Sequence, residues 1–357
     1  MTTTSERVAD QLTRQESKRI SQSVFDGSRL RVVLLVDVYD GAQQQFLEAY
    51  EQLCNQVASV PGHVSDQLCQ SIENPSQWLI TSEWESAPPF LAWVNSEEHV
   101  QMVEPLHACV RNTRSLRFHV VRETGGDAAA AAAGKRRLQA APRIGDGVIR
   151  HALTFTVKPG SEAKVAEILS GYDSPDPHVD DTTRLCRTSL FMHGNRVVRA
   201  VEVRGDLLAA LRHVARQPEV RAVEQAINPY LEQDRDLDDQ ESARMFFTRA
   251  ALPAVHHMTA DGLPEGERHA LYYPAKPDQG MRLAELLAQQ DEKAAQDPAH
   301  PVLRSTIFHR EDVVVRLVDV PVGSGNELAA PPAALRKLLD GEPVRMQLIT
   351  DRRSPDA

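Results

Sequence analysis

The sequence has no long hydrophobic run, few cysteines and a deficit of positive charge. No apolar stretch approaches the roughly 18 residues that a membrane-spanning helix requires. The polar start of the chain, MTTTSERVADQLTRQESKR, also lacks the apolar segment of a secretory signal peptide. These absences argue against a membrane protein and predict a cytoplasmic location.

Cysteine and basic residues are too sparse for two common classes of protein. The four cysteines (Cys54, Cys69, Cys109 and Cys186) are widely spaced and form no C-x-x-C pair, which argues against a disulfide framework or a zinc site. The 40 basic residues are outnumbered by 50 acidic ones, giving a formal net charge of −10. A general nucleic-acid-binding protein needs clustered positive charge to displace counterions, so no nucleic-acid partner is expected.

The common signatures of cofactor binding and hydrolysis are also missing. There is no G-x-G-x-x-G after a strand, no Walker loop, no H-E-x-x-H and no G-x-S-x-G. Nucleotide-driven and hydrolytic reactions are therefore disfavoured. An enzyme that needs no cofactor remains compatible with the sequence.

At 357 residues the chain is too long for one ordinary core, and its composition divides it. Residues 1–28 are polar and are expected to form a flexible tail. Residues 125–147 are alanine-rich and have no apolar stripe to bury, which is typical of a linker. The predicted first domain is therefore 29–124.

An internal repeat divides the remainder of the chain. Residues 151–159 match 269–277 at an offset of 118. At an offset of 117, residues 187–191 match 304–308, and residues 197–203 match 314–320. Because the matches keep one order, chance is a poor explanation. The repeat predicts two further domains, 148–255 and 256–357.

The three predicted domains share one order of elements. The β-branched run 30–38 indicates a strand, and the apolar residues after Gly41 recur at helical spacing. Each domain then follows the order βαββαβ, which predicts an α+β fold of tandem ferredoxin-like repeats with both helices on one face of a four-stranded sheet. Because Val33 and Leu35 alternate with further apolar residues, the other face of the sheet also needs covering, by a tandem repeat or by a dimer.

Two regions carry a family resemblance. ENPSQWLITSEWES at 73–86, followed by FLAWVNSEEH at 90–99, resembles the antibiotic biosynthesis monooxygenase (ABM) family. The region 148–350 resembles the SchA/CurD-like domain of aromatic-polyketide gene clusters. The first resemblance implies the dimeric α+β barrel fold, which is built from ferredoxin-like repeats.

The resemblance also implies an activity. Fusions of the two domains are similar to proteins that oxygenate polycyclic polyketide intermediates. The implied function is a cofactor-independent monooxygenase that converts an anthrone or naphthol to a quinone or hydroxylated product in type II polyketide biosynthesis, with molecular oxygen as co-substrate. Two alternatives stay open: a polyketide cyclase or aromatase, and a non-catalytic partner in a polyketide tailoring complex. A homodimer is also compatible with the resemblance.

The three tryptophans of the chain all fall in the predicted first domain. Trp78 and Trp84 are six positions apart on one predicted strand, so both point to the same face of the sheet. Trp84 is the predicted wall of the active site, with its indole N–H available to a substrate oxygen, and Trp78 and Trp93 are predicted to contact the substrate. The structural alternative is that all three are ordinary core residues.

Histidines in the same domain are the candidate bases, because imidazole titrates near neutral pH and can take a phenolic proton. His63 or His107 is the predicted base, and His99 and Asn95 are predicted polar contacts to the substrate. The structural alternatives are an exposed or helix-capping histidine and, for Asn95, a cap of the turn before Glu97. No metal site is expected.

A pair of adjacent histidines and a pair of equivalent arginines in the later domains are expected to have structural roles. His256 and His257 are expected in a loop between the second and third repeats, and adjacent histidines are poorly placed to share one metal. Arg199 and Arg316 occupy equivalent positions of the repeat and are expected to form internal ion pairs, Arg199 with Glu202 or a neighbouring strand. The alternative is that they hold a substrate carboxylate.

Overall fold

The computed structural model describes residues 20–120, 147–171, 173–233, 235–236, 239–259, 266–297, 300–324 and 333–354. The chain forms two compact units. The N-terminal unit comprises Val24–Ala141 with Arg235–Ala251, and the C-terminal unit comprises Met1–Ser23, Pro142–Asp234 and Leu252–Ala357. The expected linker at 125–147 lies outside the described residues except for Gly147, as do residues 1–19 of the expected tail.

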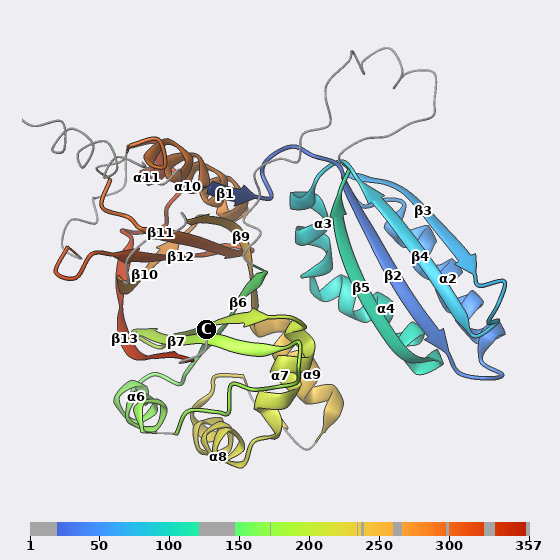
Figure 1. Cartoon of the computed structure of the whole chain (residues 1–357), viewed down its shortest axis with the longest axis horizontal. Coiled ribbons are helices and arrows are strands. Elements are labelled where there is room, and N and C mark those ends of the chain that lie inside the picture. The colour runs from blue at the N-terminus through green and yellow to red at the C-terminus, as the bar shows by residue number, and fades with distance from the viewer. Residues whose placement is uncertain are drawn as a thin grey trace, which may run out of the picture. The chain divides into compact units, whose positions relative to one another are not determined.

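The N-terminal unit contains one βαββαβ repeat (Figure 1). A helix from later in the chain belongs to the same compact unit. Its elements are β2 (Leu30–Val38), α2 (Gln43–Val57), β3 (His63–Gln70), β4 (Gln77–Trp84), α3 (Ala87–Val94), α4 (Glu97–Cys109), β5 (Val110–His119) and α9 (Gln240–Ala250). The strands form an antiparallel sheet in the order β3-β4-β2-β5. This is the ferredoxin-like order, so the fold predicted for the first domain is confirmed.

Alternation along the strands decides which face of this sheet is buried. Val36 and Val38 of β2 are buried and belong to the same core as Phe46 of α2. Leu35, which lies between the two alternating positions, is 42% exposed on the opposite face. The described helices therefore cover one face of the sheet, and no described element of this unit covers the face that exposes Leu35.

The C-terminal unit contains two further βαββαβ repeats. Their elements are β6 (Val148–Thr156), α6 (Glu162–Ser170), β7 (Arg184–His193), β8 (Arg196–Arg204), α7 (Leu207–Arg216), α8 (Pro218–Ile227), the 3₁₀ helix η1 (Asn228–Tyr230) and β9 (Ala251–Thr259), then β10 (Glu267–Pro274), α10 (Gly280–Ala294), β11 (Arg304–Arg310), β12 (Val313–Val320), α11 (Ala333–Arg336) and β13 (Val344–Arg353). Each repeat has the strand order of the N-terminal sheet. The predicted tandem arrangement is therefore confirmed.

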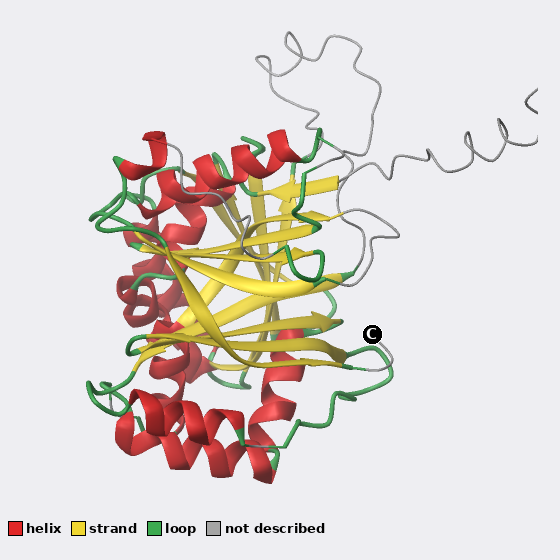
Figure 2. Cartoon of the chain, turned by 90° about the vertical axis from the view of Figure 1, so that its left-hand side faces the viewer, coloured by secondary structure: helices red, strands yellow, loops and turns green. Residues whose placement is uncertain are grey.

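The two repeats close into one barrel. The strands follow the order β9-β11-β12-β10-β13-β7-β8-β6, and β6 returns to pair with β9. The fourth strand of each repeat pairs with the second strand of the other, at β9–β11 and β13–β7. In Figure 2 the strands of this unit cross the middle of the view and helices lie at its outer sides. The inner faces bury one shared apolar cluster that includes Phe191, Phe308 and Leu317, so here a tandem repeat covers the second face of each sheet.

Two expectations at the ends of these repeats were wrong. His256 and His257 lie in strand β9 rather than in a loop, between β11 and β1, and both are buried. The His257 ring lies against Thr306 of β11, and the His256 ring faces Asp291 of α10. Strand β1 (Ile20–Ser23) belongs to the segment that was expected to be a flexible tail, and it pairs from Ile20 to Ser23 with β9. The second repeat also continues to Thr259, past the boundary expected at 255.

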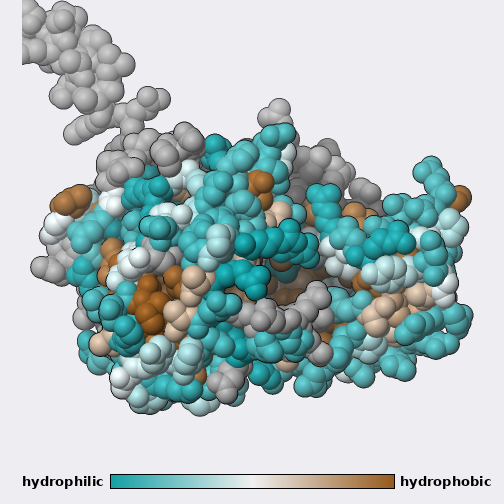
Figure 3. All heavy atoms as spheres, turned by 90° about the horizontal axis from the view of Figure 1, so that it is seen from below, coloured by the Kyte–Doolittle hydropathy of each residue, from teal (hydrophilic) through white to brown (hydrophobic). Residues whose placement is uncertain are grey.

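The described surface is mostly polar. The face in Figure 3 is largely hydrophilic, with separate smaller hydrophobic areas. Exposed large hydrophobic side chains include Leu35 and Phe118 on the N-terminal sheet. Among the described helices, none combines the length and the hydrophobicity needed to cross a lipid bilayer.

Candidate active site

An aromatic cluster lies on the helix-covered face of the N-terminal sheet, where β3 and β4 meet α3. Trp84 is the last residue of β4 and is fully buried. His63, the first residue of β3, pairs with Trp84 across the sheet. The ring centroids of His63 and Trp84 are 5.3 Å apart, in an edge-to-face arrangement. Two of the residues predicted from the sequence are therefore direct neighbours.

Further rings extend this cluster along α3 and into α4. Trp84 stacks on Trp93 at a centroid distance of 5.3 Å and meets Phe90 edge-on at 5.5 Å. His99 meets Trp93 edge-on at 4.4 Å. The backbone turns sharply here because Asn95 follows the end of α3 and the Ser96 side chain caps α4, which places His99 in the first turn of that helix. The result is a packed aromatic cluster with two histidines at its edges.

The indole N–H groups of this cluster have different roles. The Trp84 Nε1–H donates to Ser82 Oγ at 2.8 Å, so this donor already has an acceptor within the protein. The Trp93 Nε1 atom is buried and has no hydrogen-bond partner among the described residues. A buried N–H without a partner is costly, so the Trp93 N–H differs from that of Trp84, which already has an acceptor.

His63 is held by a carboxylate from its own strand. Its Nε2 atom lies 2.8 Å from Asp66 Oδ2, and its side chain is 7% exposed. The preceding Gly62 has a φ of 83°, and a Cβ atom there would lie 2.6 Å from Pro89 of α3, so only glycine lets the strand start this close to the helix.

The remaining predicted residues lie outside this cluster or have structural partners. Trp78 packs against Phe46 at 5.5 Å, towards the other end of β4, and its buried Nε1 atom also has no hydrogen-bond partner among the described residues. His107 is exposed in the last turn of α4. The Asn95 Nδ2–H donates to Leu91 O at 2.8 Å at the end of α3.

Three residues of the cluster did not emerge from the sequence alone. Phe90 lies within the segment that carries the family resemblance, but no pattern marked it as a neighbour of Trp84. Asp66 follows His63 by three positions on β3, and Ser82 precedes Trp84 by two on β4. Residues two positions apart on a strand point to the same face, so the sequence could have predicted that Ser82 lies beside Trp84.

The matched arginines of the later repeats form internal ion pairs, as expected, but with helices. Arg199 Nη1 lies 2.7 Å from Glu224 of α8 rather than against Glu202. Arg316 pairs with Asp291 of α10. These arginines therefore fasten helices to the outer face of the barrel. Among the described residues, no group of three or more His, Cys, Asp or Glu side chains is arranged to hold a metal ion.

Two family models match parts of the chain. The antibiotic biosynthesis monooxygenase model matches residues 29–105, and the SchA/CurD-like domain model matches residues 148–260. The first match contains the aromatic cluster around Trp84. The second begins at β6 and extends one residue past the end of β9.

Three relatives match over nearly their whole length. The chain is 60% identical to "Polyketide synthase CurD" of Streptomyces cyaneus, covering 94% of this chain and 97% of that protein. It is 60% identical to the "42.8 kDa protein in whiE locus" of Streptomyces coelicolor, covering 94% and 90%. It is 57% identical to "Protein SchA" of Streptomyces halstedii, covering 94% and 96%. The similarity therefore extends over both compact units.

Solved structures resemble a smaller part of the chain. SnoaB of Streptomyces nogalater, described as a cofactor-independent oxygenase, is 18% identical with a TM-score of 0.26, covering 27% of this chain and 96% of that chain. A conserved protein from Methanosarcina mazei Go1 is 19% identical with a TM-score of 0.25, covering 26% and 93%.

Proposed function

Because the chain belongs to the SchA/CurD-like family, we propose that it acts in the biosynthesis of an aromatic polyketide and that its ABM domain is a cofactor-independent monooxygenase. The monooxygenase part of this proposal is supported by the largely buried pair of His63 and Asp66 beside the stacked rings of Trp84 and Trp93. A base next to a flat aromatic wall suits a polycyclic phenol. The proposed substrate is an anthrone or naphthol, with molecular oxygen as co-substrate.

The proposed reaction begins with a proton transfer. His63 Nδ1 takes the phenolic or enolic proton, and the Asp66 carboxylate at Nε2 stabilises the imidazolium that forms. The resulting carbanion passes one electron to O₂, and the two radicals combine to form a carbon–oxygen bond. The peroxide takes up a proton and loses water, which removes the second hydrogen of that carbon and leaves a carbonyl. The substrate supplies all the electrons, so the steps balance without a further reductant.

The aromatic cluster would bind and shield the reacting ring. Trp93, which is partly exposed and stacks on the buried Trp84, would offer its ring and its N–H to the substrate. Closure of this apolar site over the substrate would keep bulk water away from the peroxide. Trp78, His99 and Asn95 are proposed as further contacts to the same substrate.

Oxygen uptake separates this proposal from the alternatives. Purified, metal-free protein is incubated with an anthrone while dissolved oxygen and product mass are recorded. Oxygen consumption with a quinone product supports the monooxygenase. A dehydrated or mass-neutral product from a poly-β-ketone would instead identify a cyclase, and the absence of any turnover would identify a non-catalytic partner of a tailoring complex.

Replacing Trp93 with phenylalanine tests the proposed hydrogen bond. Trp93→Phe keeps an aromatic ring against Trp84 but removes the indole N–H. Since a neutral hydrogen bond contributes about 0.5–1.5 kcal/mol, KM for the anthrone is expected to rise about fivefold, with the circular dichroism spectrum unchanged. An unchanged KM would show that the indole N–H does not bind the substrate.

We also propose that a second copy of the chain covers the open face of the N-terminal sheet. Leu35 and Phe118 are 42% and 50% exposed on that face. Alternation and strand register place the half-buried Val33, Leu79 and Leu116 on it as well. In the C-terminal unit, two sheets of the same strand order cover these equivalent faces with each other. A second N-terminal unit is therefore the partner that fits best.

Leu35→Lys is expected to convert a dimer into a monomer. A lysine there would place a charge at the centre of the proposed apolar interface, where it would lose its hydration. Sedimentation equilibrium should give twice the chain mass for the wild type and the single chain mass for the variant. Leu47→Lys is the control, because Leu47 is exposed on α2, on the helix-covered side. A monomeric wild type would contradict the proposal.

A further inference from the structure

Arg117 of β5 lies on the side of the N-terminal sheet that carries the aromatic cluster. It pairs across the sheet with the buried Val32 of β2, and residues paired in this way point to the same face. The guanidinium carbon of Arg117 lies 5.3 Å from the centroid of the Phe90 ring. Phe90 in turn contacts Trp84 at 5.5 Å and Trp93 at 6.3 Å. Arg117 is therefore a neighbour of the candidate active site.

The edge of the sheet beside this cluster is accessible to solvent. Strand β5 is an edge strand, and Thr113, Ser115 and Arg117 occupy alternate positions of it, so all three point to the helix-covered face. All three are nevertheless exposed, so the helices do not cover this strand. Phe90 is 3% exposed, whereas Trp93 is partly exposed. The accessible neighbours of Phe90 are thus an aromatic ring and a cation.

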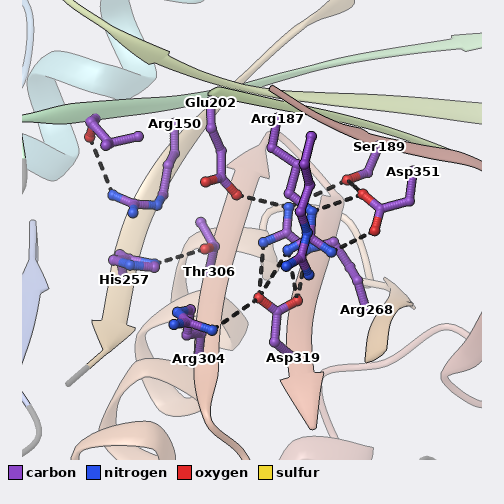
Figure 4. Close-up of polar contacts among 12 residues, drawn as sticks. Arg150, Arg187, Ser189, Glu202, His257, Arg268, Arg304, Thr306, Asp319 and Asp351 are labelled. Atoms are coloured by element: carbon purple, nitrogen blue, oxygen red, sulfur yellow. Dashed lines mark hydrogen bonds and ion pairs between the residues drawn. The ribbon is translucent and has the colours of Figure 1, made fainter. Parts of the chain in front are cut away.

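Arginines of the C-terminal barrel show the usual way in which this chain compensates a guanidinium. There, a charged layer consists of Arg187, Arg268, Glu202, Asp319 and Asp351 (Figure 4). Arg268 Nε donates to Asp319 Oδ1 at 2.8 Å, and its Nη1 lies 2.7 Å from Glu202 Oε1. Arg187 Nε donates to Asp351 Oδ1 at 2.8 Å. Both guanidinium groups are therefore neutralised within the protein.

Arg117 has no such compensation. Among the described residues, no carboxylate forms an ion pair with it, and its guanidinium lies against the face of the Phe90 ring. Arg114 also lacks a carboxylate partner in the described part of the chain, but it pairs with Leu35 and so points to the opposite face of the sheet. A ring face attracts a cation without using the N–H donors of the guanidinium. Those donors can form two parallel hydrogen bonds to a carboxylate.

We propose that Arg117 binds a carboxylate of the substrate, so that the N-terminal unit selects a polycyclic aromatic acid over its neutral analogue. This inference rests on the proposed monooxygenase site and narrows its substrate class. The fused rings would lie against Trp93, and the carboxylate would accept hydrogen bonds from Arg117 at the exposed edge of the sheet. Because Trp93 and Arg117 both adjoin Phe90, one fused-ring ligand can contact both. Arg117 determines specificity and takes no part in the proton transfer.

The positions of Arg117 and the proposed base favour a long substrate. His63 lies on β3 and Arg117 on β5, which are the two edge strands of the sheet. Three spacings between neighbouring strands separate their backbones by about 14 Å. A ligand of several fused rings suits this separation, with its carboxylate at one end and the oxidised carbon towards the other.

Titration calorimetry of the full chain with anthraquinone-2-carboxylate tests the inference without turnover. We expect the wild type to bind this acid about tenfold more tightly than the neutral anthraquinone-2-carboxamide, because charge-assisted hydrogen bonds are stronger than neutral ones. Arg117→Gln should abolish the preference by weakening the binding of the acid alone. Arg117→Lys should retain part of it, because the positive charge remains. Arg111→Gln is the matched control, because Arg111 lies 5.6 Å from the Tyr39 ring at the other end of β5 and is 59% exposed.

The ligand pair and the control separate binding by charge from simple packing. Equal binding of acid and amide by the wild type, or an unchanged preference in Arg117→Gln, would overturn the inference. If Arg117→Gln and Arg117→Lys weakened both ligands equally, Arg117 would only cover Phe90, and the inference would also be wrong. The same holds if Arg111→Gln lost the preference, since a general effect of charge would then account for it. Because calorimetry does not depend on oxygen uptake, failure here and failure of the monooxygenase proposal are distinguishable.

Discussion

Asp319→Asn is expected to destabilise the C-terminal barrel by about 3–5 kcal/mol in unfolding free energy. Asp319 is 1% exposed and accepts two hydrogen bonds from Arg268 and further contacts from Arg187. The amide would leave these buried guanidinium groups with too little negative charge. Chemical denaturation followed by far-UV circular dichroism measures the loss. Tryptophan fluorescence provides an internal reference, because all three tryptophans belong to the N-terminal unit.

The same carboxylate predicts how barrel stability depends on pH. Burial raises the pKa of Asp319, but the neighbouring Arg268 and Arg187 outweigh this and hold the pKa below its ordinary value. A carboxyl that is more acidic in the folded state contributes stability that is present above about pH 4 and is lost as the pH falls through the folded-state pKa. The wild-type barrel should therefore lose stability below about pH 4, and Asp319→Asn should lose less over the same range.

A matched surface variant checks that these effects come from burial. Glu167 forms an exposed pair with Lys164 at 2.9 Å, and Glu167→Gln is expected to leave the denaturation midpoint unchanged. If Asp319→Asn unfolded at the wild-type denaturant concentration, the charged layer would have no role in holding the two repeats together.

The repeated fold could be predicted because its signals are local. Alternation in the run 30–38 depends on neighbours within about ten residues, and the later repeats are recognised by matching short segments of this kind 117–118 positions apart. The closure of the barrel depends instead on distant pairs. Arg187 and Asp351 are 164 positions apart, and no spacing in the sequence connects them. For the same reason, His256 and His257 could not be assigned to a strand before the two strands that flank β9 were known.

The candidate site was partly accessible from the sequence. Trp84 and His63 begin or end adjacent strands, so their proximity follows once the sheet order is known. The sheet order does not show which indole N–H is already hydrogen-bonded, because that depends on the contact between Ser82 and Trp84. Sequence reasoning also left His63 and His107 equivalent as bases. Burial separates them, since the side chain of His63 is 7% exposed while His107 is exposed on α4.

His63→Gln is expected to lower kcat for anthrone oxidation about a hundredfold or more, the usual scale for the loss of a general base. Glutamine keeps a polar side chain beside Trp84 and Asp66 but cannot take up a proton. KM should change little, because the aromatic walls that bind the ring remain in place. Stopped-flow or steady-state oxygen uptake measures both constants.

His107→Gln is the matched variant, because it makes the same chemical change on α4 at an exposed position. It should retain wild-type kcat if His63 is the base. The reverse pattern would transfer the role of base to His107. Full activity in both variants would show that neither predicted base is needed, and the proposed site of the chemistry would be wrong. Unchanged circular dichroism spectra are required of both proteins, so that a loss of rate is a loss of chemistry and not of fold.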